Sequence, residues 1–151
     1  MGFSPIGLIV GLAVLAPNLL LLWLPPRTTS PPPPIPALLS WLERAGQALC
    51  LVVPAITEPG PLVGWWSAPA VVALLGYYAL WARYVFTGRD QATLYWRWWV
   101  IPVPMAVLPV IVFLSTAGWL SNAWIAASAV VLAAGHIPAS LIIARSTRVR
   151  G

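Results

Sequence analysis

Apolar residues recur along this chain in long runs, separated by short stretches that hold proline and charge. A run of roughly 20 apolar residues has the length that an α-helix needs to cross a lipid bilayer. The pattern therefore predicts an all-α integral membrane protein, a single transmembrane domain built as a bundle of five helices. The five predicted spans cover residues 3–24, 37–56, 65–85, 98–117 and 122–144.

The stretches that connect the predicted spans differ in composition. Residues 25–36 are rich in proline, which favours an extended and semi-rigid polyproline II segment. Residues 86–97 form the most polar connector, and residues 145–151 form a basic tail. Proline also interrupts the first span at Pro17, next to Asn18, which must find a hydrogen-bond partner inside the membrane.

The composition of the chain excludes several other classes of protein. Of its 151 residues, 60% are hydrophobic and 7% are charged, whereas soluble domains carry about 25% charged residues. The chain holds one cysteine and one histidine, too few for a disulfide or a cysteine- or histidine-rich metal site. We therefore expect neither a metal ion nor another cofactor.

The arginines predict the orientation of the chain in the membrane. All eight basic residues are arginines, and the formal net charge is +5. Arginines scattered singly at helix ends argue for a membrane and against binding of nucleic acid. Since positive residues favour the cytoplasmic side, the N-terminus is expected outside and the C-terminus in the cytoplasm, in a multi-pass protein of the bacterial inner membrane. The arginines on the predicted cytoplasmic side are Arg27, Arg83, Arg89, Arg97, Arg145, Arg148 and Arg150.

Polar side chains inside the predicted spans concentrate in the cytoplasmic half. With a rise of about 1.5 Å per residue, they lie roughly 9–15 Å from the cytoplasmic ends of their helices. An ionisable residue inside a span points to a functional site. We therefore predict a polar, aromatic-walled cavity that binds or transports a small hydrophobic or amphipathic molecule. Its predicted ligand-binding residues are Asn18, Glu43, Arg44, Gln47, Tyr77, Tyr78, Trp81 and His136.

Glu43 and His136 are the two residues that offer acid and base chemistry within the spans. Histidine titrates near neutral pH, and a neighbouring carboxylate shifts either partner. The structural alternative is that both residues only hold helices together, Glu43 through Arg44 or loop groups and His136 through a backbone carbonyl or Asn18. The sequence favours a protein without catalytic activity, with a membrane enzyme acting on a lipid or isoprenoid as one alternative.

A third interpretation is an accessory or assembly subunit of a larger membrane complex. Gly7 and Gly11 form a Gly-x-x-x-Gly pattern, which lets two membrane helices approach closely. We expect this pattern to contact either a second copy of the chain or another membrane protein. The predicted partners are thus the lipid bilayer, a small hydrophobic ligand, and a protein bound through these two glycines.

Overall fold

The computed structural model describes residues 2–28, 31, 33–97 and 101–149. Within these residues all regular structure is helical, and Thr28 forms an isolated backbone bridge with Asp90. The described part of the chain contains no β-strand. In chain order the elements are α1 (Pro5–Leu15), η1 (Ala16–Leu19), α2 (Leu20–Trp23), α3 (Ala37–Ile56), η2 (Gly64–Trp66), α4 (Ser67–Phe86), α5 (Gln91–Tyr95), α6 (Pro104–Trp119) and α7 (Ala123–Val149).

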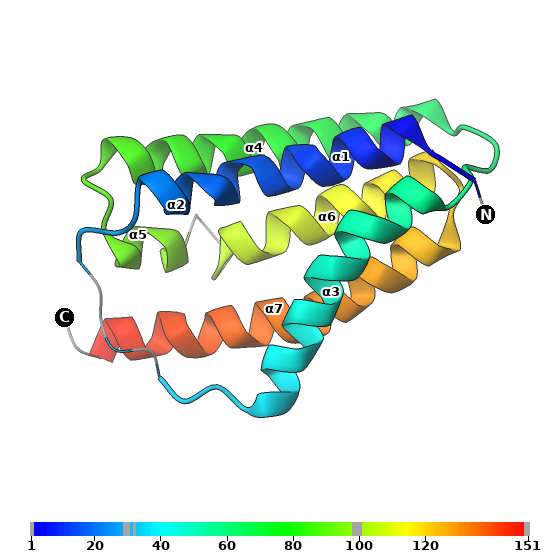
Figure 1. Ribbon diagram of the computed structural model, residues 1–151. Helices are drawn as coiled ribbons and strands as arrows, with labels where there is room; N and C mark the ends of the chain where they lie inside the picture. Colours follow the sequence, from blue (N-terminus) through cyan, green and yellow to red (C-terminus); the bar gives the residue numbers. More distant parts are fainter. Residues whose placement is uncertain (1, 29–30, 32, 98–100, 150–151) are drawn as a thin grey trace.

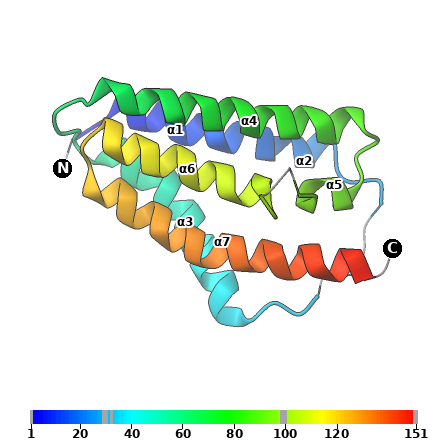
Figure 2. The same cartoon turned by 180° about the vertical axis from the view of Figure 1, so that it is seen from behind.

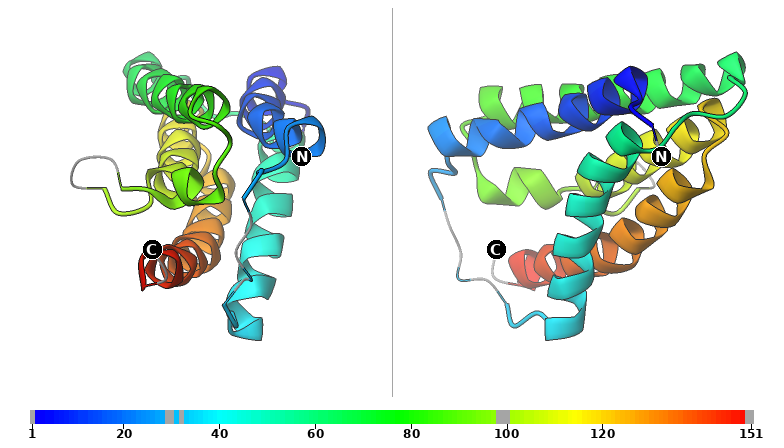
Figure 3. Two further views of the ribbon diagram at one scale, coloured as in Figure 1. Left: turned by 90° about the vertical axis from the view of Figure 1, so that its left-hand side faces the viewer. Right: turned by 45° about the vertical axis from the view of Figure 1, so that its right-hand side comes forward.

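The helices form an elongated bundle that one helix crosses obliquely. Helices α1 and α2 run in the same direction as α4 and are joined to it by side-chain hydrogen bonds, and α6 packs between α4 and α7 (Figures 1 and 2). Helix α3 packs along α7 and, at its far end, against α1. The first turns of α3 stand away from α2, so the two helices diverge toward the end that holds the C-terminus (Figure 3).

Three described segments are long and apolar enough to cross a membrane. They are Pro5–Trp23, Gly64–Phe86 and Ala123–Thr147, which correspond to the predicted spans 3–24, 65–85 and 122–144. Helix α6 is apolar but has 16 residues, about 24 Å at the α-helical rise, which is shorter than a typical hydrocarbon core. The polar residues of α3 lower its hydropathy. A helical membrane protein is thus supported by three candidate spans.

The first span bends where the sequence predicts an interruption. Pro17 lies in the 3-10 turn η1, between α1 and the short α2. A proline inside a helix lacks the N–H that would bond to the preceding turn, which favours this local change of geometry. The interruption brings the Asn18 side chain to Tyr77 of α4, 2.9 Å from the Tyr77 hydroxyl. The expectation that Asn18 has a partner is confirmed.

Two predicted span boundaries differ from the helices. Helix α6 begins at Pro104 and not at residue 98, because Pro102 and Pro104 each disfavour helical geometry in the preceding residue; residues 98–100 lie outside the described residues. Helix α7 continues to Val149, so it includes most of the stretch that we expected to be a basic tail. Nothing between residues 139 and 149 breaks a helix, and Ser146 and Thr147 bond to carbonyls of the preceding turn.

The Gly-x-x-x-Gly pattern makes its close approach within the chain. Gly7 and Gly11 are both buried, and a Cβ atom at Gly7 would overlap the carbonyl group of Pro54 on α3. At Gly11 a Cβ would lie 3.4 Å from the carbonyl oxygen of Leu51. The two glycines thus set the contact between α1 and α3. A second copy or another protein would reach this surface only if α3 moved away.

The arginine-rich end of the bundle is held together by contacts between two connectors. Thr28 donates to the Asp90 carboxylate at 2.6 Å, and Asp90 also caps α5 by accepting from the Ala92 N–H at 3.0 Å. These two hydrogen bonds lower the pKa of Asp90 below its usual value. The Tyr84 hydroxyl donates to the Leu24 carbonyl at 2.9 Å. The end of α2 is therefore tied to α4 and α5.

Candidate functional site

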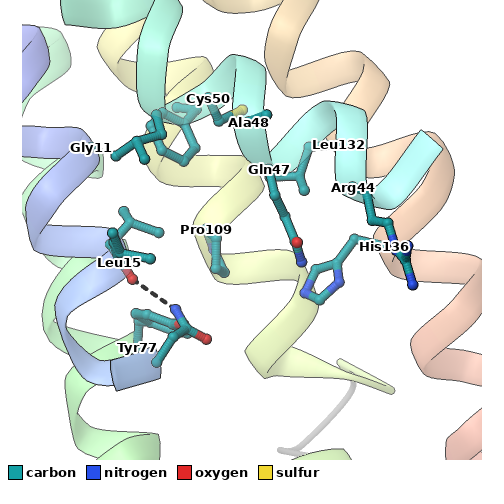
Figure 4. Close-up of a pocket in the computed structure, with 14 residues that line it drawn as sticks. Gly11, Leu15, Arg44, Gln47, Ala48, Cys50, Tyr77, Pro109, Leu132 and His136 are labelled. Atoms are coloured by element: carbon teal, nitrogen blue, oxygen red, sulfur yellow. Dashed lines mark hydrogen bonds between the residues drawn. The ribbon is translucent and has the colours of Figure 1, made fainter. Parts of the chain in front are cut away.

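A cavity of about 450 Å³ opens between α1, η1, α3, α4, α6 and α7 (Figure 4). It lies where α3 diverges from α1. Its polar groups come from five positions on η1, α3, α4 and α7, and the rest of its wall is apolar or small. Its lining residues are Gly11, Val14, Leu15, Asn18, Arg44, Gln47, Ala48, Cys50, Leu51, Tyr77, Pro109, Phe113, Leu132 and His136.

Glu43 of α3 and His136 of α7 are in direct contact. The Glu43 Oε1 atom lies 2.6 Å from His136 Nδ1, and the two side chains are only 25% and 23% exposed. A ring nitrogen bonded to a carboxylate carries its proton toward that carboxylate, so Nδ1 is protonated in this contact. Nε2 is then the ring nitrogen that remains to accept or hold a second proton. His136 lines the cavity, whereas Glu43 contacts His136 and does not itself line the cavity.

Two glycines explain why this contact is possible. A Cβ atom at Gly46 of α3 would overlap the backbone of Leu132, and one at Gly135 of α7 would lie 2.6 Å from the carbonyl carbon of Leu42. The backbones of α3 and α7 therefore touch at this crossing, which larger residues would prevent. Glu43 and His136 lie within one turn of the crossing, where the short separation of the helices lets the two side chains meet.

Asn18 and Tyr77 form a second polar group on the opposite wall. The Asn18 amide donates to the Tyr77 hydroxyl at 2.9 Å and to the Val14 carbonyl at 3.0 Å. Figure 4 shows Tyr77 across the cavity from Gln47 and His136, with Pro109 between them. Tyr77 is 3% exposed and its ring packs edge-on against Trp81, at 6.3 Å between centroids. Packing against Trp81 therefore holds the ring of Tyr77, and with it the hydroxyl, in place.

Arg44 and Gln47 supply the remaining polar groups, both from α3. Their side chains extend toward His136 (Figure 4). Within the described part of the chain, the Arg44 guanidinium makes no ion pair, because Glu43 is engaged by His136 and Asp90 by the connector contacts. The third carboxylate, Glu58, lies beyond the opposite end of α3. The positive charge at the cavity is therefore not balanced by a contacting carboxylate of the described chain.

Five of the eight predicted ligand-binding residues line this one cavity: Asn18, Arg44, Gln47, Tyr77 and His136. Glu43 reaches it only through His136. Tyr78 points elsewhere: it is 42% exposed and its hydroxyl donates to the Ala13 carbonyl at 2.8 Å. Trp81 is packed between the rings of Tyr77 and Tyr84 and is not part of the lining. Consecutive helical positions point about 100° apart, so Tyr77 and Tyr78 cannot both face the same cavity.

The apolar part of the lining was not predicted. Val14, Leu51, Phe113 and Leu132 come from four helices, and their sequence pattern does not separate them from residues that face lipid. Pro109 is the one position that carried a signal, because a proline inside a helix is tolerated where neighbours or a cavity meet the freed carbonyl. The wall is thus assembled by packing between helices.

Tyr95 adds an ionisable group near the Glu43 side of the site. It ends the short helix α5 and packs against the buried cluster of Val103, Ala106 and Ala144. Burial raises the pKa of Tyr95, and the negative charge of Glu43 raises it further. Tyr95 is therefore neutral at physiological pH and contributes a hydroxyl, not a charge.

The arrangement does not suit a metal ion. No group of three or more histidine, cysteine or carboxylate side chains comes together among the residues that the structure describes.

A second cavity, at the other end of the bundle, lies between the loop after α3 and the start of α7. Asn122 there caps α7 and donates to Thr57 at 2.8 Å, so its amide stabilises the loop. The first cavity is thus the one whose chemistry suits a ligand.

Comparisons with known proteins give no relative. No family model, no curated protein and no solved structure matches this chain.

Proposed function

We propose that this chain is a multi-pass membrane protein that binds or transports a small hydrophobic or amphipathic molecule in the cavity between α1, α3 and α7. The observation that supports this most is the lining: an apolar wall with Asn18 and Tyr77 at one side and Arg44, Gln47 and His136 at the other. Cavities of 300–1,000 Å³ with few polar groups on an apolar wall are typical ligand sites. A volume of about 450 Å³ falls within that range.

The proposal includes all five long helices as spans of a bacterial inner membrane. Helix α3 has 20 residues, about 30 Å, and two of them are charged. Glu43 is paired with His136, which lowers the cost of its burial, and Arg44 lines the cavity. Most of α6 is enclosed by other helices, so it needs little contact with lipid. The N-terminus would lie outside and the C-terminus in the cytoplasm, since the two connectors that carry arginines contact each other at the end of the bundle where α7 also ends (Figure 1).

Labelling of single cysteines tests this orientation. Thr87 and Ser121 are exposed and lie at opposite ends of the bundle, and Cys50 is removed by Cys50→Ser. We expect a membrane-impermeant maleimide to label a cysteine at 121 in intact spheroplasts and one at 87 only after permeabilisation. The reverse labelling would overturn the orientation, and equal labelling would overturn the assignment of opposite sides.

Native mass spectrometry of the protein, extracted gently from its own membrane, tests the binding site. Ala48 lines the cavity on an exposed part of α3, so Ala48→Phe fills the cavity without overpacking the core. Ala45 is also exposed and does not line it, which makes Ala45→Phe the matched control. We expect a retained small molecule that is lost in Ala48→Phe and kept in Ala45→Phe. A retained protein partner without a small molecule would favour the accessory subunit instead.

The contact between Glu43 and His136 supports a second candidate, a membrane enzyme acting on a lipid or isoprenoid. A carboxylate that holds one ring nitrogen of a histidine is the arrangement that prepares the other nitrogen for general acid–base catalysis. In this reading His136 would contact the substrate and Glu43 would orient the ring. A bell-shaped pH–rate profile that is lost in His136→Asn would support it, and turnover unchanged in that variant would exclude it.

A further inference from the structure

We propose that the molecule bound in this cavity is an amphiphile with one negative charge, and that its binding adds a proton to His136. The proposal rests on the proposed function, because it requires that the cavity holds a ligand. It concerns which ligand the cavity selects and what else changes when that ligand binds. Both parts follow from the charges around the cavity and from the contact between Glu43 and His136.

Arg44 selects the sign of the ligand's charge. It contributes a permanent positive charge to the cavity, and no carboxylate of the described chain contacts it. The guanidinium group bonds a carboxylate, phosphate or sulfonate through parallel N–H donors. A second cation would meet repulsion from Arg44, and a neutral molecule would leave its charge unpaired. Gln47, one turn further along α3, adds an uncharged hydrogen-bonding amide at the same wall.

The Glu43 and His136 pair keeps the net charge of the site constant. In the empty site, the charges of Arg44 and Glu43 cancel while His136 is neutral. An anion bound to Arg44 adds one negative charge to a cavity of low polarity, which is costly unless a positive charge accompanies it. The Nε2 atom of His136 takes up a proton from the solvent, and the resulting imidazolium supplies the positive charge. Glu43 stabilises this imidazolium through Nδ1, 2.6 Å away.

Other ionisable groups around His136 leave this assignment intact. Glu43 and Arg44 face it from α3, and Tyr95 approaches from α5 with its pKa raised by burial and by Glu43. Tyr77 of α4 lines the same cavity as a neutral hydroxyl. Helices α1 and α6 carry no ionisable side chain. Among these groups, His136 is the one that lines the cavity and still has a ring nitrogen, Nε2, that can accept a proton while Nδ1 stays bonded to Glu43.

The apolar part of the wall determines the rest of the ligand. Val14, Leu51 and Phe113 offer apolar surface, and the Asn18–Tyr77 pair marks the far side. A single alkyl chain fits about 450 Å³ better than a two-chain lipid, whose head group alone would enter. The two sources of the same chemistry, a free single-chain anion and the head group of an anionic phospholipid, are separated by the test below.

Calorimetry on the full chain in phosphatidylcholine nanodiscs tests the proposal with three probes of equal chain length. They are decanesulfonate, which stays anionic, decanol, which is neutral, and decyltrimethylammonium, which is cationic; protein-free nanodiscs give the background. Titrations in two buffers with different ionisation enthalpies count the protons taken up. We expect decanesulfonate to bind at least about tenfold more tightly than the other two probes and to take up about one proton above neutral pH.

Three variants assign the effect to residues. Arg44→Gln should weaken decanesulfonate at least about tenfold and leave decanol unchanged. Arg145→Gln, an exposed arginine outside the cavity, is the matched control and should change neither. His136→Asn keeps an amide nitrogen at the position of Nδ1, so the contact with Glu43 persists, but it should abolish proton uptake and flatten the pH dependence of binding.

Competition with an anionic lipid identifies the natural ligand. If phosphatidylglycerol in the nanodisc displaces decanesulfonate, the natural ligand is a lipid head group; otherwise it is a free single-chain anion.

The outcomes separate this inference from the proposed function. If decanol binds, is blocked by Ala48→Phe, and binds as tightly as decanesulfonate, the cavity is a ligand site but selection of an anion is wrong. Binding of decanesulfonate without proton uptake overturns the role of His136, and tighter binding of the cation overturns the role of Arg44. If none of the three probes binds, the proposed function falls together with the inference.

Discussion

The crossing of α3 and α7 gives the sharpest test of the structure, through the substitution Gly135→Ala. The added Cβ would lie 2.6 Å from the carbonyl carbon of Leu42 and 2.7 Å from Glu43 Cα, while ordinary contact begins at 3.4 Å. Both atoms are backbone, so neither can rotate away. Helices α3 and α7 must therefore separate by most of an ångström, and the contact between Glu43 and His136 must lengthen with them.

The expected loss of stability follows from two opposing effects. Overpacking of this kind costs about 1–3 kcal/mol in a packed core. Alanine is more favourable than glycine inside a helix by about 0.5–1 kcal/mol, which offsets part of that cost. Since the atoms that the Cβ meets are backbone, the cost falls in the upper half of that range, about 2–3 kcal/mol. We expect a net destabilisation of about 1–2.5 kcal/mol, which corresponds to a decrease in Tm of about 2–10 °C for a chain of this length.

Tryptophan fluorescence during heating in a mild detergent measures the change, since the chain holds ten tryptophans. Gly64→Ala is the matched control, because a Cβ at Gly64 meets no atom within 4 Å. A Gly135→Ala protein as stable as the Gly64→Ala protein, or more stable, would refute the close approach of α3 and α7. The position of the cavity beside that crossing would then be in doubt as well.

Three further predictions follow from polar contacts. Breaking the pair of Asn18 and Tyr77 by Asn18→Ala and Tyr77→Phe should give a coupling energy of about 0.5–1.5 kcal/mol in a double-mutant cycle of unfolding in sodium dodecyl sulfate; additive effects would show that the two do not interact. Glu43→Ala leaves His136 without its carboxylate and should destabilise the protein by about 1–2 kcal/mol in the same assay, whereas Glu58→Ala, on an exposed loop, should have little effect. Thr28→Val removes a hydrogen bond to the Asp90 carboxylate, so the pKa of Asp90 should rise toward its usual value. Asp90 is the one aspartate of the chain, so carbon-13 labelling of aspartate gives a single titrating signal.

The pH dependence of the Asp90 contacts has a definite sign. Its pKa is lower in the folded protein than in the unfolded chain, so the contacts with Thr28 and Ala92 contribute stability above the unfolded pKa, near 4. That contribution is lost as the pH falls through the folded pKa. Below that pH, faster proteolysis of the connector that follows α2 is expected in the wild type, and a smaller pH effect is expected in Thr28→Val.

The sequence alone determined the class of protein and most of the helices. Hydropathy and length are local properties, so the apolar runs predicted the three candidate spans and the bounds of α3 without knowledge of any contact. Proline chemistry is local too, and it predicted the break at Pro17. The scarcity of polar residues also carried information, because each buried polar group needs a partner and few partners exist. Asn18, Glu43 and His136 were singled out for that reason.

Only the tertiary structure decided which residues meet. The sequence pattern of α4 did not reveal that Tyr77 faces the cavity while Tyr78 bonds to Ala13, because the rotation of a helix about its axis depends on what packs against it. The same holds for Gly46 and Gly135, whose role appears only when α3 and α7 cross. The cavity exists because the divergence of α3 from α1 leaves space between helices, and that space is set by packing across the whole bundle.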